Sequence, residues 1–115
     1  MGSEYGYIKL MSWLYLLVAV IFEVGWPVSL KMAEITSAKF LWILCAIIAM
    51  ALSGLFLYLA QKEIPIGTAY SVWTGIGAVC TFFIGVLFFN DTANLMRFLG
   101  VILIISGVIL LKIGH

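Results

Sequence analysis

The chain has 115 residues, of which 65% are hydrophobic and 10% are charged, and its formal net charge is +1. Soluble domains carry about 25% charged residues, so this composition excludes a soluble globular protein and predicts an all-α membrane protein with a single domain. The near-zero charge provides no basic surface for nucleic acid, and no nucleic-acid partner is expected.

A polar lead over residues 1–10 precedes the first apolar stretch, and we expect a four-helix transmembrane domain over residues 11–115 in the lipid bilayer. The first predicted span, residues 13–30, contains a single carboxylate, Glu23. Because a charge at mid-bilayer depth costs about 3 kcal/mol on insertion scales, we predict that Glu23 binds protons and a cation. The alternative is a polar residue that only helps helices to pack. A cleavable signal peptide is disfavoured, because Glu23 interrupts the apolar region and no small-x-small cleavage site follows.

Three more spans are predicted over residues 40–59, 66–89 and 95–113, joined by polar connections over 32–39, 61–65 and 90–94. Pro27 stands four residues after Glu23 and removes the amide that would bond the Glu23 carbonyl. Pro27 either kinks the helix beside Glu23 or is a proline that the membrane helix tolerates, and the sequence leaves both interpretations open.

Glycine is frequent in the third and fourth spans. Gly75 and Gly77 lie close together in the third span, where the missing side chains predict a hinge. Gly100 and Gly107 lie two turns apart on one face of the fourth span, which is typical of a helix that packs against a partner. The fourth span is therefore predicted to be a dimer helix.

Basic residues are balanced between the two sides of the predicted bundle. Each side carries three of them: Lys9, Lys62 and Lys112 on one side, and Lys31, Lys39 and Arg97 on the other. The positive-inside rule needs an imbalance to set an orientation, so we predict that the chain inserts both ways round.

Two oppositely oriented copies would bring two Glu23 side chains to one midplane cavity. Desolvation and a neighbouring like charge both favour the protonated form of a carboxylic acid, and such a pair titrates as a unit. An arriving cation then competes with protons for the same carboxylates. This competition is sufficient for antiport.

Aromatic and hydroxyl side chains accompany the acid. Trp26 lies one turn beyond Glu23, Tyr70 and Trp73 form an i, i+3 pair, and Ser53 supplies a hydroxyl from the second span. Aromatic faces attract cations, and a planar guanidinium matches a carboxylate through bidentate hydrogen bonds. A quaternary ammonium has no N–H and would depend on the aromatic rings alone. Packing or a position in the interfacial belt is the alternative for these aromatic residues.

Three stretches, Phe22–Trp26, Ile64–Ala78 and Gly100–Val108, resemble the small multidrug resistance family of proton-coupled exporters, and the resemblance extends over the chain from Met11 onward. It implies an antiparallel, dual-topology homodimer with alternating access in the bacterial inner membrane. It also implies that the first-span glutamates bind protons or substrate, driven by the proton gradient without a cofactor or metal.

Within that family, Trp26, the run Trp73–Gly77 and Leu111-Lys112 look like the guanidinium-exporter subtype, which implies a small organic cation as substrate. The resemblance implies a binding site made of five residues: Glu23, Trp26, Ser53, Tyr70 and Trp73. In it Ser53 would bond the glutamate, Tyr70 would act as a gating or coupling hydroxyl, and the tryptophans would form walls.

Three residues near Glu23 depart from the pattern expected for the subtype and bear on the shape of the cavity: Val20, Gly25 and Pro27. A broad exporter of quaternary-ammonium and multidrug cations is therefore the alternative within the class. A non-transporting membrane subunit is the alternative from another class. An enzyme is least supported, because the sequence has no metal-spaced His/Cys set, no nucleophile with a base and no phosphate-binding loop.

Overall fold

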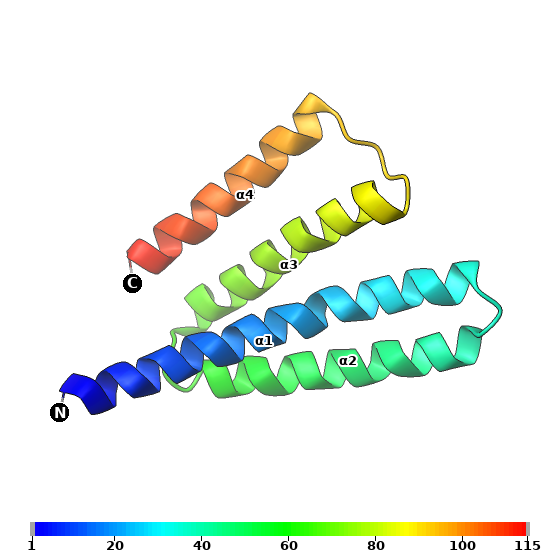
Figure 1. Ribbon diagram of the computed structural model, residues 1–115. Helices are drawn as coiled ribbons and strands as arrows, with labels where there is room; N and C mark the ends of the chain where they lie inside the picture. The colour runs from blue at the N-terminus through cyan, green and yellow to red at the C-terminus, as the bar shows by residue number, and fades with distance from the viewer. Residues whose placement is uncertain (1, 115) are drawn as a thin grey trace.

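Four α-helices joined by short connections make up the described part of the chain (Figure 1). The computed structural model describes the backbone of residues 2–114 and the side chains of residues 6–114. Helix α1 spans Gly2–Ile35, α2 spans Lys39–Ala60, α3 spans Ile66–Phe88 and α4 spans Leu95–Ile113. All four are long and apolar enough to cross a membrane, which confirms the all-helical membrane fold. Successive helices run in opposite directions, so the start of α1 and the end of α4 lie at the same end of the bundle.

Helix α1 is longer than the span predicted over residues 13–30. It begins at Gly2, so the polar lead is helical from that residue, and it ends at Ile35. The connection predicted over residues 32–39 is therefore reduced to residues 36–38. At 1.5 Å per residue, its 34 residues measure about 51 Å, against about 30 Å for the hydrocarbon core of a bilayer. Hydropathy marks the part of a helix that suits lipid, whereas the helix itself extends beyond that part and continues past Pro27, which has no amide to donate.

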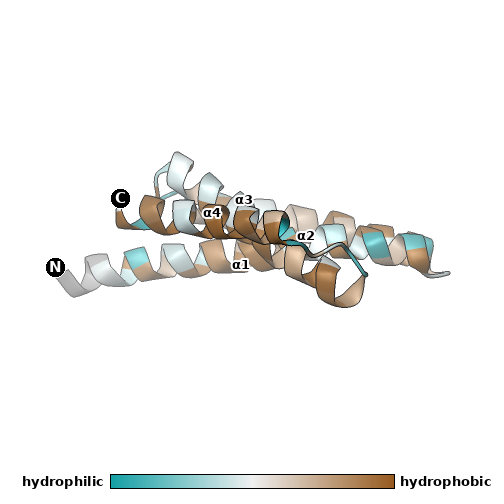
Figure 2. Cartoon of the chain, turned by 90° about the horizontal axis from the view of Figure 1, so that it is seen from above, coloured by the Kyte–Doolittle hydropathy of each residue, from teal (hydrophilic) through white to brown (hydrophobic). Residues whose placement is uncertain are grey.

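Small side chains line the interface between α1 and α2, which pack together along their length. Ala19, Ala46, Ala49 and Ala60 are all buried, and a Cβ added at Gly25 would lie 3.8 Å from that of Ala49. Small residues let two helix backbones approach closely, which is the usual basis of packing between membrane helices. Most large apolar side chains face outward instead, and Figure 2 shows hydrophobic ribbon along the helices and hydrophilic ribbon mainly near their ends.

An apolar cluster fixes the start of α3 against α1. Its buried members are Leu16 of α1, Ala60 at the end of α2, Ile64 in the connection, and Ala69 and Val72 of α3. Ile64 is 1% exposed, so the short second connection is anchored rather than free. Because this cluster holds one end of α3, it sets which residues of α3 face α1 further along.

Helix α4 packs along α3, and it starts with a side-chain cap. The Asn94 side chain accepts a hydrogen bond from the Arg97 amide at 2.9 Å, which satisfies one of the free N–H groups of a helix start. Only Val101 of α4 is buried among the described residues, so most of its surface is open.

Candidate functional site

Glu23 is half-buried on α1 and bonded to a tryptophan of the same helix. The Trp26 Nε1–H group donates to Glu23 Oε1 at 2.7 Å. Residues three apart lie on the same face of a helix, so the sequence spacing alone brings these side chains together. A hydrogen bond to an ionised carboxylate is shorter and stronger than a neutral one. The indole therefore orients the carboxylate and uses one of its oxygens.

Gly77 of α3 packs against the stem of Glu23. A Cβ added at this buried glycine would lie 2.8 Å from Glu23 Cγ and 3.7 Å from Glu23 Cβ. Carbon atoms prefer separations of about 3.5–4.0 Å, so a larger residue at position 77 would displace the glutamate. The α3 backbone thus forms one wall of the carboxylate site.

Ser53 of α2 joins three helices at the level of Glu23. Its side chain is buried, its Oγ–H donates to the Ala19 carbonyl at 2.7 Å, and its Oγ accepts from Trp73 Nε1 at 2.8 Å. Ala19 lies four residues before Glu23, so its carbonyl is the one that accepts the Glu23 amide in an α-helix. The resemblance implied that Ser53 bonds the glutamate itself. In this structure Ser53 bonds the backbone one turn away and the Trp73 indole.

Tyr70 lies at the edge of this group. Its ring centroid is 5.4 Å from that of Trp73, at an interplanar angle of 53°, and the residue is 54% exposed. The Thr74 hydroxyl donates to the Tyr70 carbonyl at 2.8 Å, so the Thr74 side chain is hydrogen-bonded to the backbone of its own helix. A gating or coupling role for the Tyr70 hydroxyl stays a prediction.

The two predicted hinge glycines face opposite neighbours. The side-chain directions of residues two apart on a helix differ by about 200° around the helix axis. A Cβ added at Gly75 would lie 2.9 Å from Val108 Cγ2 of α4, whereas Gly77 faces α1. Each glycine therefore allows a close helix approach, and their action as a hinge stays a prediction. The predicted dimer glycines, Gly100 and Gly107, meet no heavy atom within 4 Å, so their face of α4 is open in this chain.

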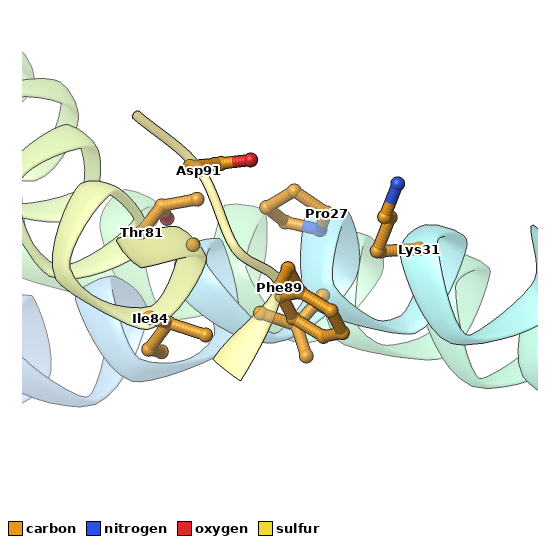
Figure 3. A pocket seen from close by; sticks show the side chains of 8 residues that line it. Pro27, Lys31, Thr81, Ile84, Phe89 and Asp91 are labelled. Carbon is orange, nitrogen blue, oxygen red and sulfur yellow. The ribbon is translucent and has the colours of Figure 1, made fainter. Parts of the chain in front are cut away.

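A cavity of about 260 Å³ lies between α1 and α3, beyond Glu23 on the side toward the end of α1 (Figure 3). We call it the outer cavity. Its labelled walls are Pro27 and Lys31 of α1, Thr81 and Ile84 of α3, and Phe89 and Asp91 after α3. The sequence analysis did not identify this cavity as a site. A signal was present, since Glu23, Pro27 and Lys31 are spaced four apart and share one face of a helix.

Charged groups near the outer cavity are few. Lys31 Nζ lies 3.6 Å from Glu34 Oε2 on the same helix, and both side chains are partly exposed. In the described part of the chain, no group of three or more His, Cys, Asp or Glu residues is arranged to hold a metal ion. The functional groups that line the cavity include the Asp91 carboxylate, the Lys31 ammonium, the Thr81 hydroxyl and the Phe89 ring.

Comparison with known proteins gives a consistent result. The family model described as Small Multidrug Resistance protein matches residues 11–104. A guanidinium exporter of Yersinia pseudotuberculosis is 41% identical over 104 residues, covering 90% of this chain and 99% of that protein. Guanidinium exporters of Salmonella typhimurium and Escherichia coli K12 are 42% and 41% identical over the same length, with 98% of each protein covered.

Proposed function

This chain belongs to the small multidrug resistance family of transporters, and from that premise we propose that it exports guanidinium or guanidinyl-type cations in exchange for protons. It is an integral membrane protein of the bacterial inner membrane. The similar proteins of Yersinia, Salmonella and Escherichia are guanidinium exporters, which supports the choice of substrate.

The hydrogen bond between Trp26 and Glu23 is the observation that carries the proposal. An ionised carboxylate has two oxygens and about four lone-pair sites, and in the described part of the chain Glu23 receives this one bond, at 2.7 Å. The remaining sites suit either a proton or the parallel N–H groups of a planar guanidinium. Trp26 and Trp73 add aromatic surface that attracts a cation away from water.

Exchange follows from competition for this carboxylate. When a guanidinium ion binds between the two Glu23 carboxylates of a dimer, both release their protons; when the ion leaves on the other side, two protons return, so each cycle moves one net charge. The energy comes from the proton gradient, and no cofactor is required. Glu23, Trp26, Ser53, Tyr70 and Trp73 make up the proposed site, with Ser53 keeping α1 and α3 in register.

The working unit in this proposal is an antiparallel homodimer. One chain supplies a single Glu23 carboxylate, so a second copy would complete a site with two carboxylates. The balanced basic residues allow both orientations to insert. The open face of α4 that carries Gly100 and Gly107 is available for packing against a second α4.

Electrical recording on proteoliposomes tests the transport proposal. Guanidinium is applied to the purified protein, and the proton-coupled current is compared with that of Glu23→Gln. We expect current from the wild type and none from the variant, with both proteins dimeric by size-exclusion chromatography. Current with tetraalkylammonium but not with guanidinium would favour the multidrug alternative. Current with neither, from folded dimers, would favour a non-transporting subunit.

Terminal tags test the orientation. We expect a tag on either end to be accessible from both sides of the membrane in roughly equal populations. A single orientation in nearly all molecules would contradict the antiparallel homodimer.

A further inference from the structure

The outer cavity begins one helical turn beyond the contact between Glu23 and Gly77, at Pro27 and Thr81. Helices α1 and α3 run in the same direction and touch at this pair, then diverge toward their C-terminal ends (Figure 1). On α1 the face that carries Glu23 continues through Pro27 to Lys31, and on α3 the face that carries Gly77 continues through Thr81 to Gly85. Pro27, Lys31, Thr81 and Gly85 all line the cavity. The two helix faces that carry Glu23 and Gly77 therefore extend about 12 Å, eight residues of helix, to the far end of the cavity.

The lining repeats the chemistry of the inner site. Asp91 supplies a carboxylate, Phe89 an aromatic ring and Thr81 a hydroxyl. The inner site has the same three groups in Glu23, its tryptophans and Ser53. At about 30 Å³ per water molecule, 260 Å³ holds a small organic cation with part of its hydration shell.

The chain fold holds Asp91 at this cavity. Asn90 has a φ of 59°, and this left-handed turn brings the Asp91 amide back to donate to the Gly85 carbonyl at 3.0 Å. The Asp91 carboxyl group lies over Gly85, where an added Cβ would meet the carboxyl carbon at 3.0 Å. The C-terminal end of a helix is negative, so a carboxylate placed there does not help the helix and adds to the attraction for a cation.

We propose that the outer cavity is a second binding station for the guanidinium group, with Asp91 as its anionic ligand, on the path between Glu23 and the membrane surface. This inference rests on the proposed function. In an antiparallel dimer the two copies would present one such station at each surface.

Lys31 explains why the station would release its cation. It lies on the α1 wall, opposite the connection that carries Asp91 (Figure 3), and its ammonium pairs with Glu34 at 3.6 Å. Asp91 and Glu34 are negative and Lys31 is positive, and Arg97, which donates to the Thr92 carbonyl next to Asp91, adds a second positive charge. A cation is attracted, but a positive charge nearby keeps the affinity low, as conduction through successive sites requires.

Transport kinetics of three variants test the station. Asp91→Asn removes the charge, and Gly85→Ala keeps the charge but displaces the carboxylate. Glu63→Gln removes one negative charge at the other end of the bundle and is the matched control. We expect Asp91→Asn to raise the KM for guanidinium about fivefold, the effect of one unit charge about 4 Å away in water, and to change the maximal rate less than twofold. Gly85→Ala should raise KM in the same direction, and Glu63→Gln should leave it unchanged.

Salt separates a charge effect from a structural one. The Debye length falls from about 10 Å at 0.1 M salt to about 3 Å at 1 M, so the KM ratio of Asp91→Asn to wild type should approach one at high salt. The station would be overturned if Asp91→Asn had the same KM as the wild type, or if it lost maximal rate at an unchanged KM. Either result would leave the proposed function intact.

A binding measurement decides the case without transport. In Glu23→Gln, whose inner site lacks its charge, guanidinium is titrated while the NMR shifts of the Asp91 and Gly85 amides are followed. The station is supported if guanidinium causes saturable shifts and sodium at equal ionic strength does not. The absence of such shifts overturns it. A wild type that carries no guanidinium current would overturn the proposed function, and these shifts would still decide whether the cavity binds the cation.

Discussion

Replacing Gly77 with alanine should weaken guanidinium binding without unfolding the protein. The new Cβ would lie 2.8 Å from Glu23 Cγ, about 0.7–1.2 Å closer than carbon atoms prefer, so the glutamate must move. A side chain held about 30° from its rotamer costs about 0.5–1.5 kcal/mol, and losing a hydrogen bond to a charged group costs about 1.5–3 kcal/mol. At the boundary of the two ranges, about 1.5 kcal/mol, the affinity falls by roughly tenfold.

The fold itself should tolerate this change. Alanine is favoured over glycine inside a helix by about 0.5–1 kcal/mol, which offsets part of the strain. The assay is guanidinium titration followed by tryptophan fluorescence, because the Trp26 indole bonds Glu23 directly and its environment changes when the carboxylate moves.

Gly75→Ala is the matched control. It adds the same methyl group two residues away, where it would meet Val108 Cγ2 at 2.9 Å and Ile104 Cγ2 at 3.3 Å on α4. We expect it to lower the stability of the α3–α4 packing and to leave guanidinium affinity within twofold of wild type. If Gly77→Ala bound guanidinium as tightly as the wild type, the contact with α3 would not define the carboxylate site. Equal weakening by both variants would instead favour a shared hinge.

Two further substitutions test the framework around the site. Ser53→Ala should lower the free energy of unfolding by about 1–3 kcal/mol, because it leaves the Trp73 indole without its acceptor. Ser106→Ala, on the exposed face of α4, is the control and should change the free energy of unfolding by about 0.5 kcal/mol or less. Denaturant unfolding in detergent compares the two variants, and equal losses would contradict the role of Ser53. Asn94→Ala should cost about 0.5–2 kcal/mol at the start of α4, and faster hydrogen exchange of the Arg97 amide would report it; unchanged exchange would contradict the cap.

Local features of the sequence predicted part of this structure well. The extents of α2, α3 and α4 follow from hydropathy and from turn residues, which act over a few positions. The pairing of Trp26 with Glu23 follows from helical spacing, because residues three apart are neighbours on any α-helix.

Features that depend on how helices are rotated and crossed were not predictable in the same way. Ser53 faces α1 and α3 rather than lipid because the alanines of α2 pack against α1, and hydropathy does not specify that rotation. The outer cavity depends on the divergence of α1 and α3 beyond the contact at Gly77. That angle is set by the cluster around Ile64, far from the cavity in sequence.

The position of the Ser53 hydroxyl bears directly on the exchange we propose. A carboxylate that receives two or three hydrogen bonds from its own protein is stabilised in its charged form and has little need of a proton or a cation. Glu23 receives one, from Trp26, while Ser53 donates to the Ala19 backbone. The glutamate is thus oriented but incompletely satisfied, and in the proposed exchange it would gain its remaining partners from a proton or a cation. Had Ser53 bonded Glu23 as well, fewer of the carboxylate's lone pairs would be open to a proton or a cation.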